Sequence, residues 1–244
     1  MDKANWIGIP VYNCKELTLQ VIRDVLSQDI PVKVLIVNNG STDGTLEAIL
    51  AEFGQDLRIY ILDNGNNLGV GPAWNQICDY VFTVESAEHV WIINNDIRVR
   101  PDTYRNLLIP RGGFVTGVNV STMDRMNKDV ELNIDPEPIM RGGPDFSCFL
   151  VKRDFYWTIG GFPTCYWPGW FEDNEAHWVA KCKGLDKEIF SVAIPYVHIG
   201  SQTLKQNPEI QKINSTQFEK NRSLYIERWG GAPGREVFKT PYGT

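Results

Sequence analysis

The stretch VKVLIVNNGSTDGT, residues 32–45, contains the unit that decides the fold. Its first six residues are apolar except for Lys33, a pattern typical of a strand buried on both faces of a parallel sheet. The polar residues that follow, Asn38 to Thr45, form a loop rich in helix-capping side chains, and residues 46–53 continue as a helix. A buried strand, a polar loop and a helix in this order predict a β-α unit.

Similar units lie on both sides of this stretch. Apolar runs predict further strands at residues 6–11, 58–62 and 90–93, and apolar residues at helical spacing predict helices at residues 17–26 and 72–84. A β-α-β-α-β-α-β order at short intervals implies a parallel sheet with right-handed crossovers. We therefore predict a single α/β domain with a mostly parallel central sheet flanked by helices.

The regular alternation weakens after Pro101. The polar segment from Ser121 to Arg141 carries two prolines and is expected to be a long loop, of a kind that often covers a site as a lid. The other predicted elements are strands at residues 114–118 and 146–151, one or two short strands within 188–197, and helices at 153–158, 172–183, from 207, and at 215–229.

The bulk composition is that of a globular protein of ordinary size. A chain of 244 residues with 43% hydrophobic and 22% charged residues can bury a core without covalent cross-links. The net charge of −6 argues against a nucleic-acid-binding protein. No apolar run approaches the length of a membrane span. The five cysteines include no C-x-x-C pair, which argues against a zinc site and favours a reducing compartment. Since no signal peptide is visible, we expect a cytoplasmic location.

Asparagine and aspartate residues follow all four predicted strands of the first half. Because parallel strands share one carboxyl edge, these polar segments are expected to meet there and form a ligand crevice. Each segment alone would also suit a simple turn. Asp96 ends the fourth segment, where a carboxylate can hold Mg²⁺ or Mn²⁺ and, through it, a diphosphate. The four segments are residues 10–13, 38–43, 63–67 and 94–96.

Two common nucleotide-binding motifs are missing from the sequence. Residues 10–14, after the first predicted strand, contain no glycine, so the dinucleotide motif Gly-x-Gly-x-x-Gly is absent there. No Gly-Lys-Ser/Thr occurs in the chain, which excludes a P-loop. The crevice is therefore expected to bind a nucleotide through Asn and Asp side chains and a metal ion.

A second carboxylate cluster, Glu172-Asp173, follows the aromatic run of residues 166–171. The pair is expected at a helix N-terminus, where the helix dipole favours the ionised form and so suits a general base. His177 would lie one turn beyond Asp173 on the same helix face. The two carboxylates could also be ordinary charges at a helix start, and the aromatic residues could be either platforms for sugar rings or core.

Two histidines have open roles. His198 ends an apolar strand, where a histidine is more often structural than a ligand, although its imidazole could be a second metal ligand. His89 is expected to be a solvated loop residue.

Six short motifs in the chain occur together in one known family. They are Ile9-Pro10-Val11-Tyr12-Asn13, residues 37–45, Asn67-Leu68-Gly69 with Ala73-Trp74-Asn75, Asn94-Asn95-Asp96, residues 143–151 with Gly160-Gly161-Phe162, and Phe171-Glu172-Asp173. Each motif alone is weak, but six in the order of the family, over roughly residues 5–200, are specific. On these motifs the chain resembles the GT-A-fold glycosyltransferases of family 2, in particular the bacterial rhamnosyltransferase-like branch, which often has Asn-x-Asp in place of Asp-x-Asp.

The resemblance implies a Rossmann-like GT-A fold and a reaction. The family transfers a sugar from a nucleotide diphosphate sugar to an acceptor hydroxyl with inversion, and uses Mn²⁺ or Mg²⁺. For this chain we expect a UDP-sugar. By position, Asp96 would hold the metal with His198 as a further ligand. Asp173 would be the base that deprotonates the acceptor, and Glu172 would help to position acceptor or donor.

The resemblance also implies a set of donor-binding residues. Asn39 stands where the family usually has an Asp that reads the base, which leaves the base preference open. The remaining positions are Pro10 and Tyr12 at the base, Asn94 at the ribose, and Asn13, Asn67, Asn75 and Asn95 around them.

The resemblance divides the chain by function. Residues 1–100 would bind the nucleotide sugar, residues 101–230 would form the acceptor-binding and catalytic half of the same domain, and residues 231–244 would be a C-terminal tail. The expected acceptor is a glycan or glycoconjugate.

Three other functions are compatible with parts of the sequence. The same chemistry could act on a hydroxymethylated base in nucleic acid held by a basic groove, although a solvated basic face would look the same. A module that binds a nucleotide sugar or glycan without turnover is suggested by Asn in place of Asp at two strand ends, but Asp96 and Asp173 argue against it. Nucleotidyl transfer is disfavoured because no Gly-rich basic loop follows the first strand. The arginines that could line a groove are Arg98, Arg100, Arg105, Arg111, Arg125 and Arg141.

Overall fold

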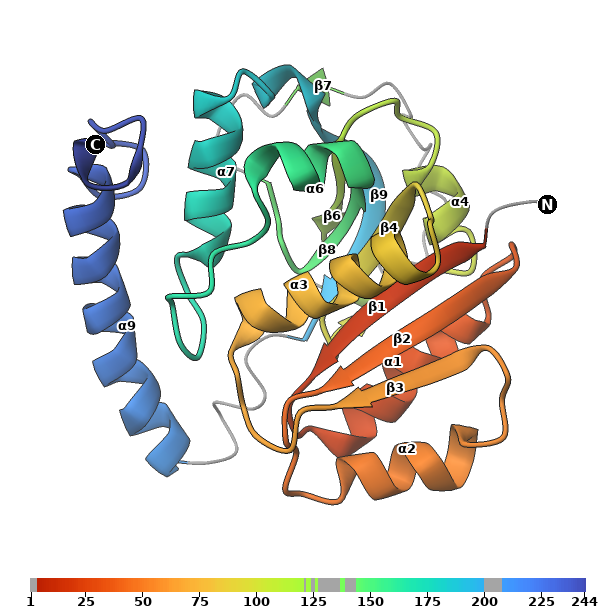
Figure 1. Cartoon of the computed structure of the whole chain (residues 1–244). Coiled ribbons are helices and arrows are strands. Elements are labelled where there is room, and N and C mark those ends of the chain that lie inside the picture. The colour runs from red at the N-terminus through yellow and green to blue at the C-terminus, as the bar shows by residue number, and fades with distance from the viewer. Residues whose placement is uncertain (1–3, 121, 124–125, 127–136, 139–143, 200–207) are drawn as a thin grey trace.

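The central sheet has the strand order β3-β2-β1-β4-β8-β6-β9-β5, and β7 pairs with β9. The computed structural model describes residues 4–120, 122, 123, 126, 137, 138, 144–199 and 208–244 (Figure 1). Nine strands are found in this part of the chain. They are β1 (Asn5–Val11), β2 (Val32–Asn38), β3 (Ile59–Asp63), β4 (His89–Ile93), β5 (Ile97–Arg98), β6 (Phe114–Asn119), β7 (Glu137–Pro138), β8 (Cys148–Lys152) and β9 (Ile189–His198).

Helices cover both faces of this sheet (Figure 1). Successive residues of a strand point to opposite faces, so Ile7 of β1 belongs to the buried cluster that contains residues of α1, α2 and α4. Trp6 belongs to the cluster on the other face, which contains residues of α3, α6 and α7. The first half of the sheet is thus buried on both sides. The helices are α1 (Lys15–Leu26), α2 (Thr45–Phe53), α3 (Val70–Asp79) with a π-helical continuation (Tyr80–Val84), α4 (Thr103–Leu107), α6 (Arg153–Ile159), α7 (Glu172–Cys182) and α9 (Pro208–Trp229), with short 3₁₀ turns at Asp186–Glu188 and Pro241–Gly243.

The predicted β-α-β-α-β-α-β order of the first half is confirmed. β1 pairs in parallel with β2 and β4, and β2 pairs in parallel with β3. The carboxyl ends of these four strands therefore share one edge, as expected from the sequence. The α/β domain with a mostly parallel sheet is the observed architecture.

Antiparallel pairing in the second half returns the chain to the same edge. β8 runs antiparallel between β4 and β6, and it places Cys148 opposite Ile93. β9 runs parallel to β6, and its last residues pair antiparallel with β5, so that His198 faces Ile97. His198 thereby lies next to the residue that ends the 94–96 segment.

Several elements of the second half differ from the sequence prediction. Residues 189–198 form one strand of ten residues, because it pairs along its length with β6 and then with β5. One helix, α9, replaces the two expected between residues 207 and 229. The expected loop of residues 121–141 falls largely outside the described residues. β5 and α4, with two and five residues, are too short to show a period in the sequence.

His89 also contradicts its prediction. It is the first residue of β4 and not a solvated loop residue, and its Nε2 atom is buried without a hydrogen-bond partner among the described residues. Burial lowers the pKa of His89, which keeps the ring neutral. The strand β4 therefore begins one residue earlier than the apolar run predicted.

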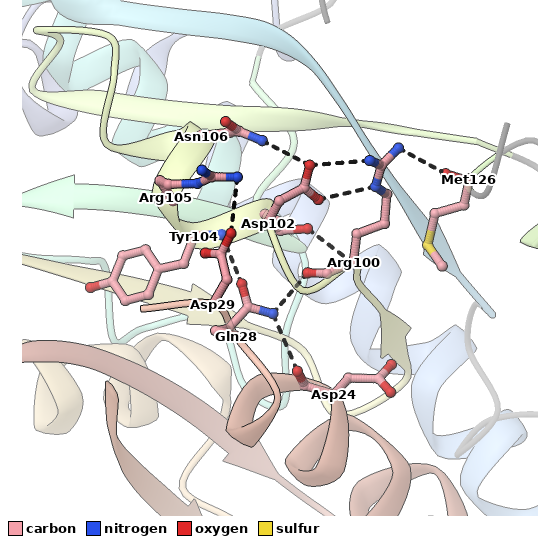
Figure 2. A network of polar contacts seen from close by, with 10 residues as sticks. Asp24, Gln28, Asp29, Arg100, Asp102, Tyr104, Arg105, Asn106 and Met126 are labelled. Carbon is pink, nitrogen blue, oxygen red and sulfur yellow. Dashed lines mark hydrogen bonds and ion pairs between the residues drawn. The ribbon is translucent and has the colours of Figure 1, made fainter. Parts of the chain in front are cut away.

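A polar network fastens the segment after Asp96 to α1 (Figure 2). Its centre is Gln28, a buried side chain at the end of α1. Gln28 Nε2 donates to the carbonyls of Asp24 at 3.2 Å and Arg100 at 2.8 Å, and its Oε1 accepts the Tyr104 N–H at 2.9 Å. Because this network joins the segment at the end of α1 to Arg100 and Tyr104, it fixes the backbone that follows Asp96, the expected metal ligand.

The arginines of this segment are paired with carboxylates. Figure 2 shows two of these pairs near the Gln28 network. Three of the arginines that could line a groove for nucleic acid are therefore already paired with carboxylates. Arg125 and Arg141 lie outside the described residues. The pairs are Arg98–Asp24 at 2.5 Å, Arg100–Asp102 at 3.0 Å and Arg105–Asp29 at 2.9 Å.

Candidate active site

Asp96 and His198, the two residues expected as metal ligands, lie side by side. His198 Nε2 is 3.1 Å from Asp96 Oδ1, and the two side chains are 24% and 12% exposed. The other ring nitrogen, Nδ1, is 3.3 Å from Ser147 Oγ. β4, β8 and β9 therefore bring three polar side chains from distant parts of the sequence to one point.

This arrangement fits a divalent cation that protein and ligand hold together. The hydrogen bond that the His198 ring donates to Asp96 raises the pKa of His198, because this carboxylate favours a positive charge beside it. Metal ions that serve phosphate ligands often take only one or two protein side chains, and phosphates and waters fill the other positions. Within the part of the chain that the structure describes, no three His, Cys, Asp or Glu side chains cluster as a complete metal site. Asp96 and His198 would therefore hold the ion with help from its ligand.

A cavity of about 460 Å³ adjoins this pair. Its lining includes Asn94, two residues before Asp96, and Ser147, which contacts His198. Glu172 and Asp173 line the same cavity, so the structure brings the two carboxylate clusters of the sequence to one space. Val70, Trp74, Pro144, Asp145 and Phe146 complete its lining.

The two neighbouring carboxyl groups have different environments. Glu172, the first residue of α7, is buried, and Asp173 is partly exposed. Burial, with repulsion from Asp173, raises the pKa of Glu172 to about 8. Burial also raises the pKa of Asp173, and the charge of Asp145 adds to this. The expectation that the helix N-terminus favours the ionised form is therefore wrong for both carboxyl groups, because loss of hydration outweighs the helix dipole.

The backbone before this pair is held in an unfavourable conformation. Trp170 and Phe171 both have positive φ angles, 70° and 75°. Non-glycine residues pay roughly 1–2 kcal/mol each for this region. Asn221 of α9 stabilises the turn, because its Nδ2 donates to the carbonyls of Trp167 at 3.1 Å and Gly169 at 2.7 Å. α9 thus helps to fix the position of the first turn of α7.

Two of the four aromatic residues in the run before the pair belong to the core. Tyr166 and Phe171 pack with Tyr225 and Trp229 of α9 in a separate buried cluster. Trp167, by contrast, is 41% exposed, although its Nε1 donates to the Asn67 carbonyl. Sequence reasoning left both explanations open, and burial assigns Tyr166 and Phe171 to the core.

The asparagines near β1 hold neighbouring loops together. Asn13 has a positive φ, and its Oδ1 accepts the Thr42 N–H at 2.7 Å. Asn95 Nδ2 donates to the Asn13 carbonyl and to Thr18 Oγ1, both at 2.9 Å. These contacts join the ends of β1, β2 and β4, so both residues shape the edge of the sheet.

Asn39 and Asn67 likewise hold together the loops between β2, β3 and α3. Asn39 is buried, donates to the Gly69 carbonyl at 3.1 Å and accepts from Asn64 Nδ2 at 2.8 Å. Asn67 Oδ1 accepts the Gly69 N–H at 2.9 Å. Each amide therefore already has protein partners in the loops that enclose the edge.

Asn75 lies elsewhere. Its Nδ2 donates to the Phe162 carbonyl, and its Oδ1 accepts the Phe162 N–H, both at 2.8 Å. It lines a second cavity, between α7 and the C-terminal segment, and not the one that holds Asp173. Pro10 is buried in β1, and Tyr12 follows that strand, partly exposed.

Three residues of the cavity that have polar side-chain groups had no predicted role. Trp74 belongs to α3, and Asp145 and Ser147 precede β8. Asp145 accepts the Ser147 N–H at 2.8 Å and the hydroxyl of Tyr196, so its carboxylate is fixed in place. Residues 143–151 stood out as a motif, but no periodicity in the sequence shows that this segment turns beside the end of β4.

Residues 6–176 match the family model described as Glycosyl transferase family 2. The chain belongs to glycosyl transferase family 2. The matched region includes Asp96 and both carboxylates at the start of α7. β9 with His198, and all of α9, lie beyond it.

Curated relatives of this family 2 chain match it over short regions. Chondroitin synthase of Pasteurella multocida (strain Pm70) and hyaluronan synthase of Pasteurella multocida are each 30% identical over 97 residues, which is 39% of this chain and 10% of the relative. Glycosyltransferase GlyG of Streptococcus pneumoniae serotype 4 is 25% identical over 108 residues, or 44% of this chain and 35% of the relative. The alignments thus span between about a tenth and a third of the relatives' length.

Solved structures show that the fold is GT-A. A mannosyltransferase from Pyrobaculum calidifontis, in complex with GDP-Man and Mn²⁺, superposes with a TM-score of 0.60 at 21% identity over 94% of this chain and 65% of that one. Residues 1–349 of TarS from S. aureus, in complex with UDP, superpose with a TM-score of 0.58 at 13% identity over 92% of this chain and 71% of that one. GalNAc-T7 with UDP, GalNAc and Mn²⁺ gives a TM-score of 0.61 at 12% identity over 92% and 50% of the two chains.

No helix in the part of the chain that the structure describes combines the length and the apolar character that crossing a bilayer requires.

Proposed function

We propose that this family 2 domain transfers a sugar from a nucleotide diphosphate sugar to an acceptor hydroxyl, with inversion and with a divalent cation. One observation carries the proposal. Ser147, which contacts the Asp96–His198 pair, and Asp173, a carboxylate at the start of α7, line the same cavity. A site for a charged leaving group and a site for a base thus flank one space.

The cation end would hold the donor. Asp96 and His198 would be its protein ligands, and the ion would be Mn²⁺ or Mg²⁺. When bound, such an ion neutralises charge that develops on the leaving diphosphate. Several solved neighbours contain UDP or GDP-Man, and two contain Mn²⁺, which supports this donor class.

The remaining donor contacts follow from the edge of the sheet. Pro10 and Tyr12 would line the base, and Asn94 would face the ribose. Asn13, Asn39, Asn67 and Asn95 would shape the loops around them through the hydrogen bonds described above. A UDP-sugar is the first candidate, and a dTDP-sugar would fit the rhamnosyltransferase-like branch.

The two carboxyl groups would divide the proton chemistry between them. Opposite environments separate the pKa values of such pairs and so assign an acid and a base. The more buried Glu172 would keep its proton at neutral pH, and Asp173 would carry the charge. Asp173 would then take the proton of the acceptor hydroxyl while the acceptor oxygen attacks the anomeric carbon on the face opposite the diphosphate. We propose a glycan or glycoconjugate as the acceptor.

A donor panel tests this function. The chain is incubated with UDP-glucose, UDP-GalNAc, GDP-mannose and dTDP-rhamnose in turn, with and without Mn²⁺, and release of the nucleotide is followed. We expect slow metal-dependent hydrolysis of at least one donor, accelerated by a glycan acceptor. No release from any donor, together with no binding of UDP or GDP, would contradict the proposal, whereas binding without release would favour the non-catalytic module.

A further inference from the structure

Two residues that line the cavity each have a buried polar atom without a hydrogen-bond partner among the described residues. The two atoms are Nε1 of Trp74 and Oε2 of Glu172. The two residues are only 2% and 7% exposed. A buried polar group left without a partner is costly, so such groups in a folded protein usually serve a bound molecule.

The position of the Trp74 ring is fixed by the core. The ring lies edge-on to Phe149 and Phe162, with centroid distances of 5.4 and 5.2 Å, and is tilted against Phe146 at 5.7 Å. These contacts leave the indole little freedom to turn its N–H toward another acceptor. The N–H is therefore a preorganised donor, and an indole can only donate.

Glu172 is fixed from the other side. It begins α7, directly after the strained residues Trp170 and Phe171. Burial keeps the proton on its carboxyl group at neutral pH. A neutral carboxyl group can both donate and accept a hydrogen bond, so it complements a hydroxyl.

We propose that the Trp74 indole N–H and the Glu172 carboxyl group together recognise the transferred sugar of the donor. This inference rests on the proposed function. A sugar ring offers oxygens that accept from an N–H and hydroxyls that pair with a neutral carboxyl. Asp145, on the same wall, offers a fixed carboxylate that accepts from a further hydroxyl.

The location favours the donor sugar over the acceptor. The sugar of a nucleotide sugar is bonded directly to the diphosphate, so it must lie next to the Asp96–His198 pair. Ser147 links that pair to this cavity, and Glu172 precedes the base Asp173 in the chain. The sugar between leaving group and base would therefore contact both orphan atoms.

Trp74→Phe tests the proposal, because it keeps an aromatic ring and removes only the N–H and part of the ring surface. Calorimetry measures the affinity for the best donor of the panel and for its free nucleotide, both with Mn²⁺. We expect donor affinity and donor hydrolysis to fall about 10- to 100-fold, the usual effect of one lost hydrogen bond with its partner left buried. Affinity for the free nucleotide should stay the same. Glu172→Gln, which keeps the shape, should likewise lower the affinity for the donor relative to that for the free nucleotide.

Trp91→Phe is the matched control. Trp91 is also a fully buried tryptophan, but its Nε1 donates to Cys148 Sγ at 3.4 Å, and it does not line the cavity. Trp91→Phe should lose some stability, as expected when a core tryptophan is replaced by a smaller ring, but its donor affinity should be unchanged. Equal donor affinity in Trp74→Phe and Trp91→Phe would overturn the proposal.

A spectroscopic readout observes the hydrogen bond itself. The indole ¹H–¹⁵N signal of Trp74, assigned by its loss in Trp74→Phe, should move downfield with the sugar nucleotide and stay in place with the free nucleotide. Equal shifts with both ligands would place the contact on the nucleotide and refute the sugar assignment. A loss confined to transfer, with normal donor binding and hydrolysis, would place it on the acceptor instead. If the wild type uses no donor at all, the proposed function itself fails, which is a separate result.

Discussion

Arg228→Ala should destabilise the domain strongly, because Arg228 of α9 neutralises a buried carboxylate on α7. Arg228 Nη2 is 2.8 Å from Glu175 Oε1, and Nε is 3.1 Å from Oε2, which makes a two-pronged ion pair. Glu175 also accepts from the Tyr166 hydroxyl and from Trp229 Nε1. Its side chain is only 6% exposed, and that of Arg228 is 19% exposed.

The size of the effect follows from this burial. Removing one partner of a buried ion pair typically costs about 3–5 kcal/mol, because the other charge stays buried and unpaired. Two neutral donors still contact Glu175 in the variant, and one fifth of the Arg228 side chain reaches solvent. We therefore expect a loss of about 2–3 kcal/mol in the free energy of unfolding. Since α9 also supports the turn before Glu172, the transfer rate should fall as well.

Urea denaturation of Arg228→Ala and of a control variant, Arg23→Ala, measures the effect. Arg23 makes an equally short two-pronged pair with Glu52, at 2.7 and 2.6 Å, but the two side chains are 47% and 35% exposed. Exposed pairs contribute little, so Arg23→Ala should cost clearly less than Arg228→Ala. Equal losses in the two variants would refute the reasoning from burial.

Two further predictions concern the network of Figure 2 and the protonation of Glu172. Gln28→Ala leaves the Arg100 carbonyl and the Tyr104 N–H without their partner, so urea denaturation should show a loss of about 2–4 kcal/mol, and a loss below about 0.5 kcal/mol would contradict the role of the network. The pKa of Glu172 is raised from 4.5 to about 8 in the native state, so its contribution to stability is full below pH 4.5 and is lost as the pH rises toward 8. Glu172→Gln should therefore gain stability relative to the wild type between about pH 5 and 8, by no more than about 1.4 kcal/mol per pH unit; a pH-independent difference between the two proteins would count against a buried neutral carboxyl.

The first half of the fold could be predicted because local patterns specify it. Runs such as residues 32–37 are apolar enough to be buried on both faces, and polar loops separate them from amphipathic helices. The pairing of β8 between β4 and β6 could not be predicted, because it depends on contacts between segments that are distant in sequence. The same limit explains why β9 was not recognised as one long strand.

The candidate site could be predicted only in part. Asp96, Glu172 and Asp173 stood out by residue type and position, and the structure brings Asp173 and Glu172 to a cavity beside Asp96. Sequence patterns do not show burial, so the direction of the Glu172 pKa shift was predicted wrongly. They also could not show that Trp74 has an unpaired N–H, since this depends on the surroundings of one atom.

The asparagines show the same limit of sequence reasoning, and their donor-binding roles stay predictions. Asn75 was grouped with the donor-binding residues, and in the structure its amide binds the backbone of Phe162. Asn39 and Asn95 likewise make hydrogen bonds that hold loops together. An asparagine in a polar loop carries no mark in the sequence that separates ligand contacts from loop contacts, because both use the same amide group.

The central claim is that the Asp96 end holds the donor and Asp173 acts as the base, and one paired measurement tests it most directly. Donor affinity and transfer rate are measured on the same preparations of wild type, Asp96→Ala and Asp173→Asn. Asp96→Ala should lose the metal-dependent part of donor affinity. Asp173→Asn should keep that affinity, because a base acts in the transition state, while its transfer rate falls about 10²- to 10⁴-fold. Undiminished metal-linked affinity in Asp96→Ala, or an unimpaired transfer rate in Asp173→Asn, would contradict the account.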